Sequence, residues 1–531
     1  CLVGSEMCIR DSINAMAGLS WQERKYDYSR MYTENFTTDF FEDFNMDAGT
    51  KPDAPKTYWE RWAMNSYFLR FAYTFKDRYS ATITGRYDGS SKFGKNNKYA
   101  FFPSAGLAWN ITQEDFMSDQ NTISNLKLHT SYGLTGNSEI GVYKSLATVK
   151  SETLLLNGTR NSYSYLNRLP NSDLKWEKTA QFDIGFDLGL FNNRITLDAS
   201  YYNKKTSDLL LDAPVPHTTG FETVYKNIGS IRNKGFEVSA AWNKSFGDWN
   251  VGVRVNGSTL KNEAVEVGDP IFYKNNSYGT QDGDDWDNHS ITQNGYAVGS
   301  YYGWKVAGIF QNQQEIDALN AQSPTGKYQD GDTAPGDFKY IDLNGDGQIT
   351  DEDRTVIGNG FPTLSYGLNL TASYKNFDFS MNMYGVAGMD VYSYSAARLT
   401  SMYGPDGGYQ NVLAEYVKNA WTLENPNGKY PRITKGDHNK NHRSSDAFIK
   451  KGDYLKISNI QFGYTFPKNL VKHAKMENAR MFVSADNILT LSSYNKWGDP
   501  EVGSDRVLLT GFDGGRYPFP LSVSFGVSVQ F

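Results

Sequence analysis

Apolar and polar side chains alternate along much of this chain with a period of two residues. In the clearest case, Gln181 to Leu190, every second residue is apolar. Such alternation predicts β-strands with one apolar face. The pattern recurs on both sides of four turn sequences, which predicts hairpins of strands about ten residues long, the length at which a tilted strand crosses a bilayer. The turns are Lys76-Asp77, Asn192-Asn193, Gly247-Asp248 and Lys375-Asn376.

The connections between the predicted strands alternate between short and long. Because consecutive strands of an antiparallel sheet run in opposite directions, this alternation places every long connection on the same side. Short turns on one side and long loops on the other are typical of outer-membrane barrels. We therefore predict an all-β fold, an antiparallel transmembrane β-barrel with about 14 recognisable strands. The long connections are expected at 25–65, 89–99, 135–177, 207–231, 260–361, 387–452 and 489–520.

The segment "LSVSFGVSVQF", residues 521–531, alternates throughout and finishes on an aromatic residue, Phe531. Read alone, it fits a half-buried edge strand of a β-sandwich as well as a membrane strand. The alternating connection lengths favour the membrane strand, because a soluble sandwich has no reason to keep them.

Composition and charge narrow the function classes. The chain has 531 residues and a formal net charge of -6, so it offers no basic excess for nucleic acid. Aromatic residues make up 15% and glycine is frequent, a composition that favours strands and turns over helices. No run reaches the roughly 18 apolar residues of a membrane-spanning helix, which excludes a helical membrane protein but not a barrel.

The first residues, "CLVGSEMCIRDS", fit no pattern in the rest of the chain and contain both cysteines, Cys1 and Cys8. An acylated lipoprotein Cys1 and a small disulfide loop are two interpretations. We favour a third, a non-native segment that resembles translated adaptor sequence, and exclude residues 1–11 from fold reasoning. Residues 12–531 are then the barrel-forming part.

The stretch "IDLNGDGQITDED", residues 341–353, has the spacing of a calcium-binding loop. Gly347 permits the sharp turn that such a loop needs, and hard oxygen ligands suit Ca²⁺. An Asx-rich turn held by its own backbone hydrogen bonds is the alternative. No amphipathic helix precedes the loop, so we expect a structural site and not a sensor. The candidate ligands are Asp342, Asn344, Asp346, Gln348 through its backbone carbonyl, and Asp353.

Catalytic motifs give little support to an enzyme. His438 and His442 lack the glutamate of a zinc-protease motif, and we interpret them as solvated loop residues. Asp284 and Asp285 have no scaffold that would make them glycosidase carboxylates. Several loop aromatics could stack on sugar rings, with loop packing or a membrane girdle as alternatives. These are Trp286, Tyr301, Tyr302, Trp304, Tyr392, Tyr403 and Trp497.

Many segments, in order, resemble the SusC-like (RagA-like) branch of TonB-dependent outer-membrane transporters. The resemblance extends from about residue 12 to the end of the chain. Segments that carry it include "LKLHTSYGLTGN" (126–137), "NIGSIRNKGFEVS" (227–239), "PGDFKYIDLNGDGQITDEDRTVIGNGFP" (335–362), "YLKISNIQFGYTFP" (454–467) and "ADNILTL" (485–491).

The resemblance implies import of a bulky nutrient, an oligosaccharide or a peptide, across the outer membrane. It further implies contact with outer-membrane lipid, energy from the TonB complex acting on a plug domain, and a SusD-like surface lipoprotein as a lid. Such barrels have about 22 strands around the plug. With about 14 strands and no plug, the chain is expected to be a C-terminal part of the barrel.

A calcium-stabilised surface β-protein, an adhesin that binds glycans, is the alternative function. It accounts for the 341–353 loop and for the loop aromatics. It explains neither the alternating connection lengths nor the strand closed by Phe531.

Overall fold

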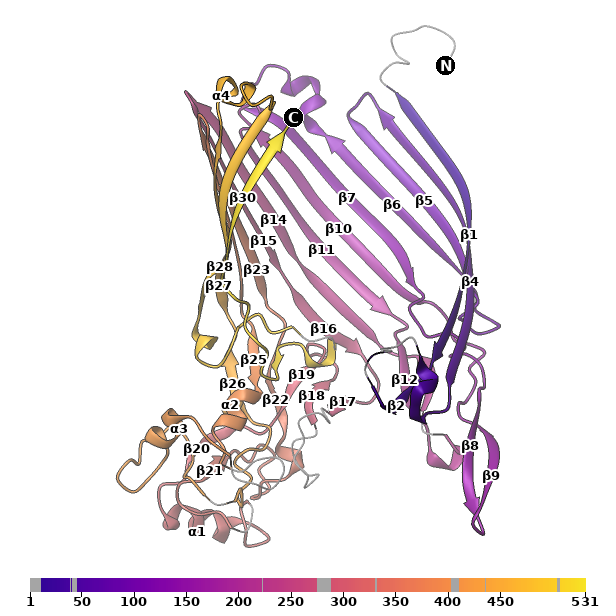
Figure 1. Ribbon diagram of the computed structural model, residues 1–531, viewed down its shortest axis with the longest axis vertical. Coiled ribbons are helices and arrows are strands. Elements are labelled where there is room, and N and C mark those ends of the chain that lie inside the picture. The colour runs from indigo at the N-terminus through magenta and orange to yellow at the C-terminus, as the bar shows by residue number, and fades with distance from the viewer. Residues whose placement is uncertain are drawn as a thin grey trace. The chain divides into compact units, whose positions relative to one another are not determined.

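The computed structural model describes residues 11–38, 40, 45–221, 223–274, 288–329, 332–402, 410–434, 436–503 and 507–531. Its main feature is an antiparallel sheet of fifteen strands in the described residues (Figure 1). One of the fifteen, β16 (Lys261–Glu266), pairs only with β14 and lies off the path, which leaves fourteen strands in continuous order. The path has two ends, β1 and β30, so these residues form an open sheet. The predicted strand number and fold class are confirmed.

The path follows the order of the sequence from one sheet neighbour to the next. Its strands are β1 (Ser12–Arg30), β4 (Lys56–Phe75), β5 (Tyr79–Ser90), β6 (Tyr99–Asn110), β7 (Ile123–Asn137), β10 (Glu177–Leu190), β11 (Ile195–Ser207), β14 (Ser230–Phe246), β15 (Trp249–Thr259), β23 (Leu364–Tyr374), β24 (Phe377–Ala387), β27 (Tyr454–Thr465), β28 (Asn478–Ser492) and β30 (Ser522–Gln530). Several exceed the predicted ten residues: β1 has 19 and β4 has 20.

The predicted turns are tight. Lys375 and Asn376 alone join β23 to β24, and Gly247 and Asp248 join β14 to β15. Positive φ angles at Lys375 (50°) and Gly247 (57°) match the twist of the adjoining strands. Two connections on the same side, 111–122 and 466–477, are longer than expected. In the first, the Gln120 side chain accepts a hydrogen bond from the Ile123 N–H at 2.6 Å and donates one to the Ile123 carbonyl oxygen at 2.7 Å.

The long connections fall at 31–55, 91–98, 138–176, 208–229, 260–363, 388–453 and 493–521, close to the predicted ranges. They carry small sheets of their own. These are β2 (Thr33–Phe36) with β3 (Gly49–Pro52), β8 (Val149–Leu156) with β9 (Thr159–Leu166), β12 (Leu210–Pro214) with β13 (Thr223–Asn227), β17 (Ile271–Lys274) with β18 (Asn288–Thr292), β19 (Ser300–Gly303) and β22 (Thr355–Gly358), β20 (Val306–Ile309) with β21 (Phe338–Tyr340), and β25 (Asp390–Ser393) with β26 (Ile449–Lys451) and β29 (Phe512–Asp513).

Helices are short and confined to connections. They are α1 (Gln313–Gln322), α2 (Tyr394–Leu399), α3 (Ala414–Asn419) and α4 (Lys468–Lys472). The 3-10 turns are η3 (Met46–Ala48), η4 (Ile111–Gln113), η5 (Asp115–Met117), η6 (His217–Thr219), η7 (Asp351–Asp353), η8 (Asp446–Phe448), η9 (Ser493–Lys496) and η10 (Val507–Leu509). Within the described part of the chain, no helix combines the length and apolarity required to cross a membrane.

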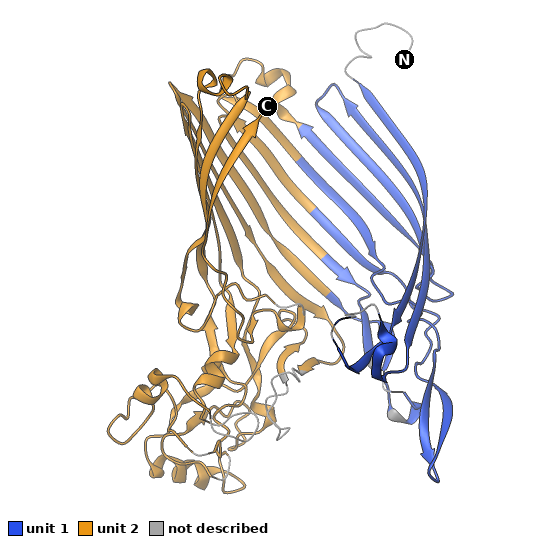
Figure 2. Cartoon of the chain, viewed as in Figure 1, with its two compact units in different colours: residues 1–109, 129–182, 205–230 blue, residues 110–128, 183–204, 231–531 orange. Residues whose placement is uncertain are grey.

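The chain divides into two compact units (Figure 2). Unit 1 comprises residues 1–109, 129–182 and 205–230, and unit 2 comprises 110–128, 183–204 and 231–531.

In unit 1, the exposed face of β5 and β6 is apolar in the middle and aromatic at both ends. Tyr79 stacks on Trp109, with ring centroids 6.3 Å apart, and Tyr87 stacks on Tyr99 at 5.1 Å. Ile83 lies between the two pairs and is 61% exposed. Tyr79 and Tyr87 are eight residues apart, about 27 Å along a strand. At a tilt of about 40° this is about 21 Å across the membrane, close to the height of an apolar band of about 25 Å flanked by aromatic girdles.

In unit 2, apolar residues on one face of the strands are likewise exposed. Phe236 and Val238 of β14 are 59% and 43% exposed, and Phe525 of β30 is 83% exposed. Exposed apolar side chains at every second position are stable only against another apolar medium. This face is therefore the one that contacts lipid.

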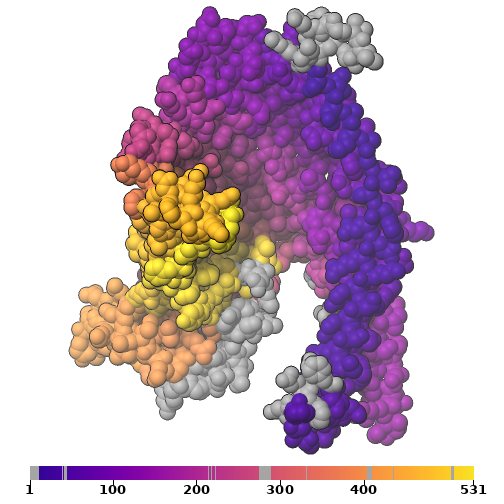
Figure 3. Space-filling view, turned by 45° about the horizontal axis from the view of Figure 1, so that its top comes forward, coloured from indigo at the N-terminus to yellow at the C-terminus, as the bar shows by residue number. Residues whose placement is uncertain are grey.

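The three longest connections of unit 2 fold together. We call the described parts of 260–363, 388–453 and 493–521 the loop module. Tyr301, Tyr392 and Phe512, one from each connection, are buried in a single cluster. In the space-filling view, residues near 400 (orange) lie against C-terminal residues (yellow), and β25 pairs with β29 (Figure 3).

Candidate functional site in the loop module

The predicted calcium loop, which follows β21, is a series of Asx turns. Asp342 accepts hydrogen bonds from the N–H groups of Gly345 and Gly347, at 2.6 and 2.8 Å. Asn344 and Asp346 each accept one from the residue two positions on, at 2.9 Å. These three candidate ligands are therefore brought together in one turn. The hydrogen bonds are those expected of the Asx-turn alternative.

The other two candidates, Gln348 and Asp353, have different roles. Asp353 is fully buried and accepts from the N–H groups of Leu343 and Thr350, both at 2.8 Å, so it closes the loop. The Gln348 side-chain oxygen accepts from the Thr325 hydroxyl at 3.3 Å. Its backbone carbonyl was the predicted ligand atom.

Among the described residues, no group of three or more His, Cys, Asp or Glu side chains is placed to hold a metal ion. A carboxylate oxygen that accepts one N–H keeps a further lone pair for a cation. The oxygen-only donor set of the loop is of the kind that Ca²⁺ prefers. Calcium binding here stays a prediction.

Trp304 connects this loop to the connection 388–453. It is 2% exposed, and its indole N–H donates to the Thr350 carbonyl at 2.9 Å. The Arg354 and Arg443 guanidinium carbons lie 4.7 and 5.0 Å from its ring centroid. Arg443 also lies 4.5 Å from the ring of Tyr340. Such cation–π contacts are stronger when water is excluded.

A buried ion pair joins the same two connections. The Arg432 guanidinium donates to both carboxylate oxygens of Asp337, at 2.8 and 3.0 Å. Asp337 is fully buried and also accepts from the Asn441 amide at 3.1 Å and the Ala334 N–H at 2.9 Å. With four donors on one carboxylate, the charge is well compensated.

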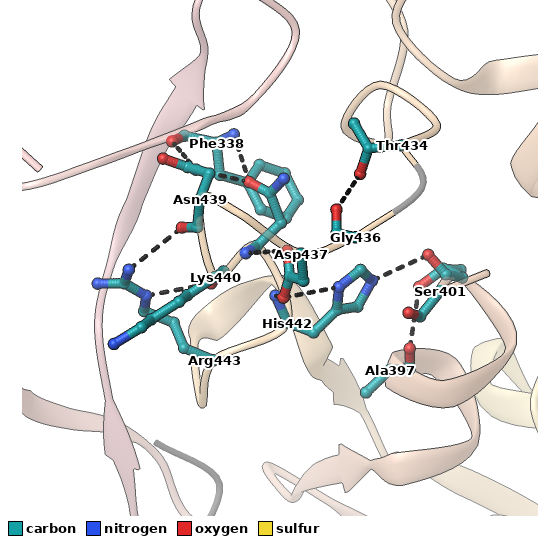
Figure 4. A network of polar contacts seen from close by, with 12 residues as sticks. Phe338, Ala397, Ser401, Thr434, Gly436, Asp437, Asn439, Lys440, His442 and Arg443 are labelled. Atoms are coloured by element: carbon teal, nitrogen blue, oxygen red, sulfur yellow. Dashed lines mark hydrogen bonds and ion pairs between the residues drawn. The ribbon is translucent and has the colours of Figure 1, made fainter. Parts of the chain in front are cut away.

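His442 corrects the sequence-based interpretation, because it is buried and not solvated. Its Nδ1 lies 3.2 Å from Asp437 Oδ2 (Figure 4). Its Nε2 lies 3.0 Å from the Thr400 carbonyl oxygen. Burial opposes the charged ring, but Asp437 and the Thr400 carbonyl outweigh it and raise the pKa of His442 above its usual value. The polar neighbours come from segments that the sequence does not place together. His438, by contrast, is exposed as expected.

The loop aromatics divide into two groups. Tyr301, Trp304 and Tyr392 are at most 2% exposed, so they pack the module and are not available to stack on sugars. Trp497 and Tyr302 are partly buried and keep accessible surface. Trp286 and Tyr403 lie outside the described residues, as do residues 1–10 and the Asp284-Asp285 pair.

Trp497 lines a cavity of about 500 Å³ between the three connections. Asp446 and Lys450 contribute an acid and a base. Burial raises the pKa of Asp446, while burial and nearby Lys496 lower the pKa of Lys450. Asp446 Oδ1 accepts from the Val306 N–H at 3.0 Å. An acid, an amine and an indole around one cavity suit a neutral polar group such as a sugar hydroxyl or an amide.

Sequence reasoning missed these partners. Arg432 and Asp337 are 95 positions apart, and Val306 and Asp446 are 140 apart. No short motif or periodicity reports such pairs, and only co-variation among homologues could have found them.

Comparison with known proteins agrees with the fold. The family model for "TonB dependent receptor-like, beta-barrel" matches residues 11–386. The chain is 32% identical to TonB-dependent receptor P3 of Formosa agariphila, over 98% of this chain and 50% of that protein. It is also 32% identical to TonB-dependent receptor SusC of Bacteroides thetaiotaomicron, over 89% of this chain and 44% of that protein.

Among solved structures, the RagAB peptide transporter aligns with a TM-score of 0.80 and 24% identity, covering 98% of this chain and 53% of that chain. The chain thus spans about half the length of the curated relatives it matches. The matched family model, the identity to SusC and the open antiparallel sheet agree. The chain belongs to the TonB-dependent receptor β-barrel family of the outer membrane.

Proposed function

We propose that this chain forms barrel wall and outer loops of a transporter that imports a bulky nutrient, an oligosaccharide or a peptide, in a TonB-dependent manner. The observation that carries the proposal is the lipid-facing sheet combined with a folded loop module on the long-connection side. The TonB complex supplies energy through a plug domain, and a SusD-like lipoprotein covers the module. Transport is binding and gated passage, without covalent chemistry.

The cavity beside Trp497 supports a polar, bulky substrate. Its acid, amine and indole offer hydrogen bonds and one apolar surface, as sugars and peptides require. RagAB, whose fold this chain shares, is a peptide transporter.

The test is uptake by cells that carry the complete gene. Deletion of the gene, or collapse of the proton motive force, should abolish accumulation of a labelled oligosaccharide or a labelled peptide. Trp497→Ala should raise the half-saturating concentration, whereas Leu423→Ala, an exposed apolar change elsewhere in the module, should not. If cells without the gene took up both labelled nutrients normally but no longer attached to glycan surfaces, the adhesin alternative would be supported instead.

We also propose that Ca²⁺ binds the 341–353 loop and holds it against the module. Support comes from the oxygen-only donor set of Asp342, Asn344 and Asp346, which a single turn brings together. The double change Asp342→Ala and Asp346→Ala should increase protease cleavage in this loop and remove the effect of a chelator. Asp317→Ala, an acidic change on α1, is the control. Cleavage that is the same in all proteins, with and without chelator, would contradict calcium binding.

A further inference from the structure

A second cavity, of about 890 Å³, lies in unit 2 where the strands β11, β14, β15 and β16 meet the loop module. One wall is aromatic: Tyr201 and Phe236 pack with ring centroids 5.1 Å apart. Phe236 belongs to the exposed apolar face of β14 together with Val238 and Trp242. The cavity therefore opens onto the face that contacts lipid.

The depth of this cavity follows from the strand. Phe236 and Phe246 are the outermost exposed aromatic residues on this face of β14 and are 48% or more exposed, and Lys244 lies two residues inside Phe246. Ten residues span about 34 Å along a strand, or about 26 Å across the membrane at a tilt of about 40°. Because this equals the height of the apolar band, Phe236 lies at its loop-side edge. Lys234, two residues further on the same face, lies at the level of lipid head groups.

The wall beside Phe236 is basic. Lys234 and Lys261 both line the cavity, and Lys261 is paired only loosely with Glu263, at 3.7 Å with a side chain 65% exposed. The acid in the lining, Asp390, is committed elsewhere: Lys451 donates to Oδ1 at 2.8 Å and the Asn359 N–H to Oδ2 at 3.2 Å. The cavity thus presents two amines next to the rings of Tyr201 and Phe236.

We propose that the cavity binds a phosphate-bearing lipid of the outer leaflet. The phosphate lies between Lys234 and Lys261, and an acyl chain lies along Phe236 and Tyr201. Lysine pairs with phosphate through charge-assisted hydrogen bonds, and the acyl chain removes apolar surface from water. A soluble anion would use only the lysines. The aromatic wall, continuous with the lipid-contacting face, favours a lipid.

This binding is independent of the imported substrate. The cavity is also lined by residues of the segments 295–300 and 356–363, which form the base of the loop module. A bound lipid would therefore connect the base of the module to the surrounding leaflet.

The test uses the full-length transporter, purified in mild detergent and checked for heat-modifiable migration. Native mass spectrometry measures binding of lipid A and of dephosphorylated lipid A. The double change Lys234→Gln and Lys261→Gln should weaken lipid A binding about tenfold or more. Phe236→Ala should weaken both lipids severalfold. Lys244→Gln, at the other end of the same face of β14, should leave binding unchanged.

Three outcomes would overturn the proposal. Equal binding of lipid A by the native protein and by the double lysine variant would remove the phosphate site. Equal loss in Lys244→Gln would mean that any lysine on this face attracts the lipid. Full displacement of lipid A by millimolar inorganic phosphate, with no effect of Phe236→Ala, would reduce the site to a free-anion site.

Discussion

Removing the carboxylate of Asp337 should open the loop module locally. In Asp337→Ala, the Arg432 guanidinium loses both of its hydrogen bonds to the carboxylate, and the Asn441 amide and Ala334 N–H lose an acceptor. Breaking a buried pair costs about 3–5 kcal/mol. Because the Arg432 side chain is 30% exposed and can reach water, we expect the lower end, about 3 kcal/mol.

Amide hydrogen exchange of the purified full-length protein measures this opening. About 3 kcal/mol corresponds to exchange roughly 150-fold faster where local opening governs it. The reporters are the Arg432 N–H, which donates to the Gly336 carbonyl at 2.7 Å, and the Phe338 N–H, which donates to Asn441 at 2.9 Å.

Lys451→Met is the matched control, because it breaks the exposed pair with Asp390. An exposed pair contributes up to about 1 kcal/mol, so exchange should change less than about fivefold. If Asp337→Ala gives no more acceleration than this control while strand amides stay protected, the buried pair does not stabilise the module.

Two further changes test other contacts of the module. Gly303→Ala should accelerate amide exchange at Trp304 and Asp446, because a Cβ at Gly303 would lie 2.1 Å from the Ser444 carbonyl oxygen. In the control Gly257→Ala, the atom nearest to the added Cβ is 3.8 Å away, so exchange should not change. Equal acceleration in both variants would contradict this steric argument. The raised pKa of His442 predicts that its stabilising contact is complete below the unfolded pKa of about 6.5 and is lost as pH rises through the folded pKa. Amide exchange at 437–443, corrected for its intrinsic pH dependence, should therefore become faster as the pH rises in the native protein and stay constant in His442→Gln. If the two proteins had the same pH profile, protonation of His442 would not stabilise this segment.

The sheet could be predicted because its information is local. Alternation and turn residues such as Lys375 and Gly247 are enough to predict the strands and the side of the sheet on which each connection lies. The loop module could not be predicted in this way, since its partners come from distant segments. His442 illustrates the difference: its sequence neighbours are polar, and only Thr400 and Asp437 explain its burial. The prediction that Tyr301 and Tyr392 could stack on sugars was wrong for a similar reason. The sequence does not distinguish an aromatic residue that packs in a core from one that faces a sugar.

The organisation of the loop module limits which of its positions can vary independently. Buried polar groups of one connection are satisfied by another: Asp337 by Arg432, the Val306 N–H by Asp446, and the Tyr494 hydroxyl by Ser393 at 2.9 Å. A buried polar group left without its partner costs more than the net gain of forming the bond. Removing one connection would therefore leave buried polar groups of the others without these partners. Substitutions are then best tolerated at partly exposed positions such as Trp497, while substitutions in the buried polar network require compensating changes in another connection.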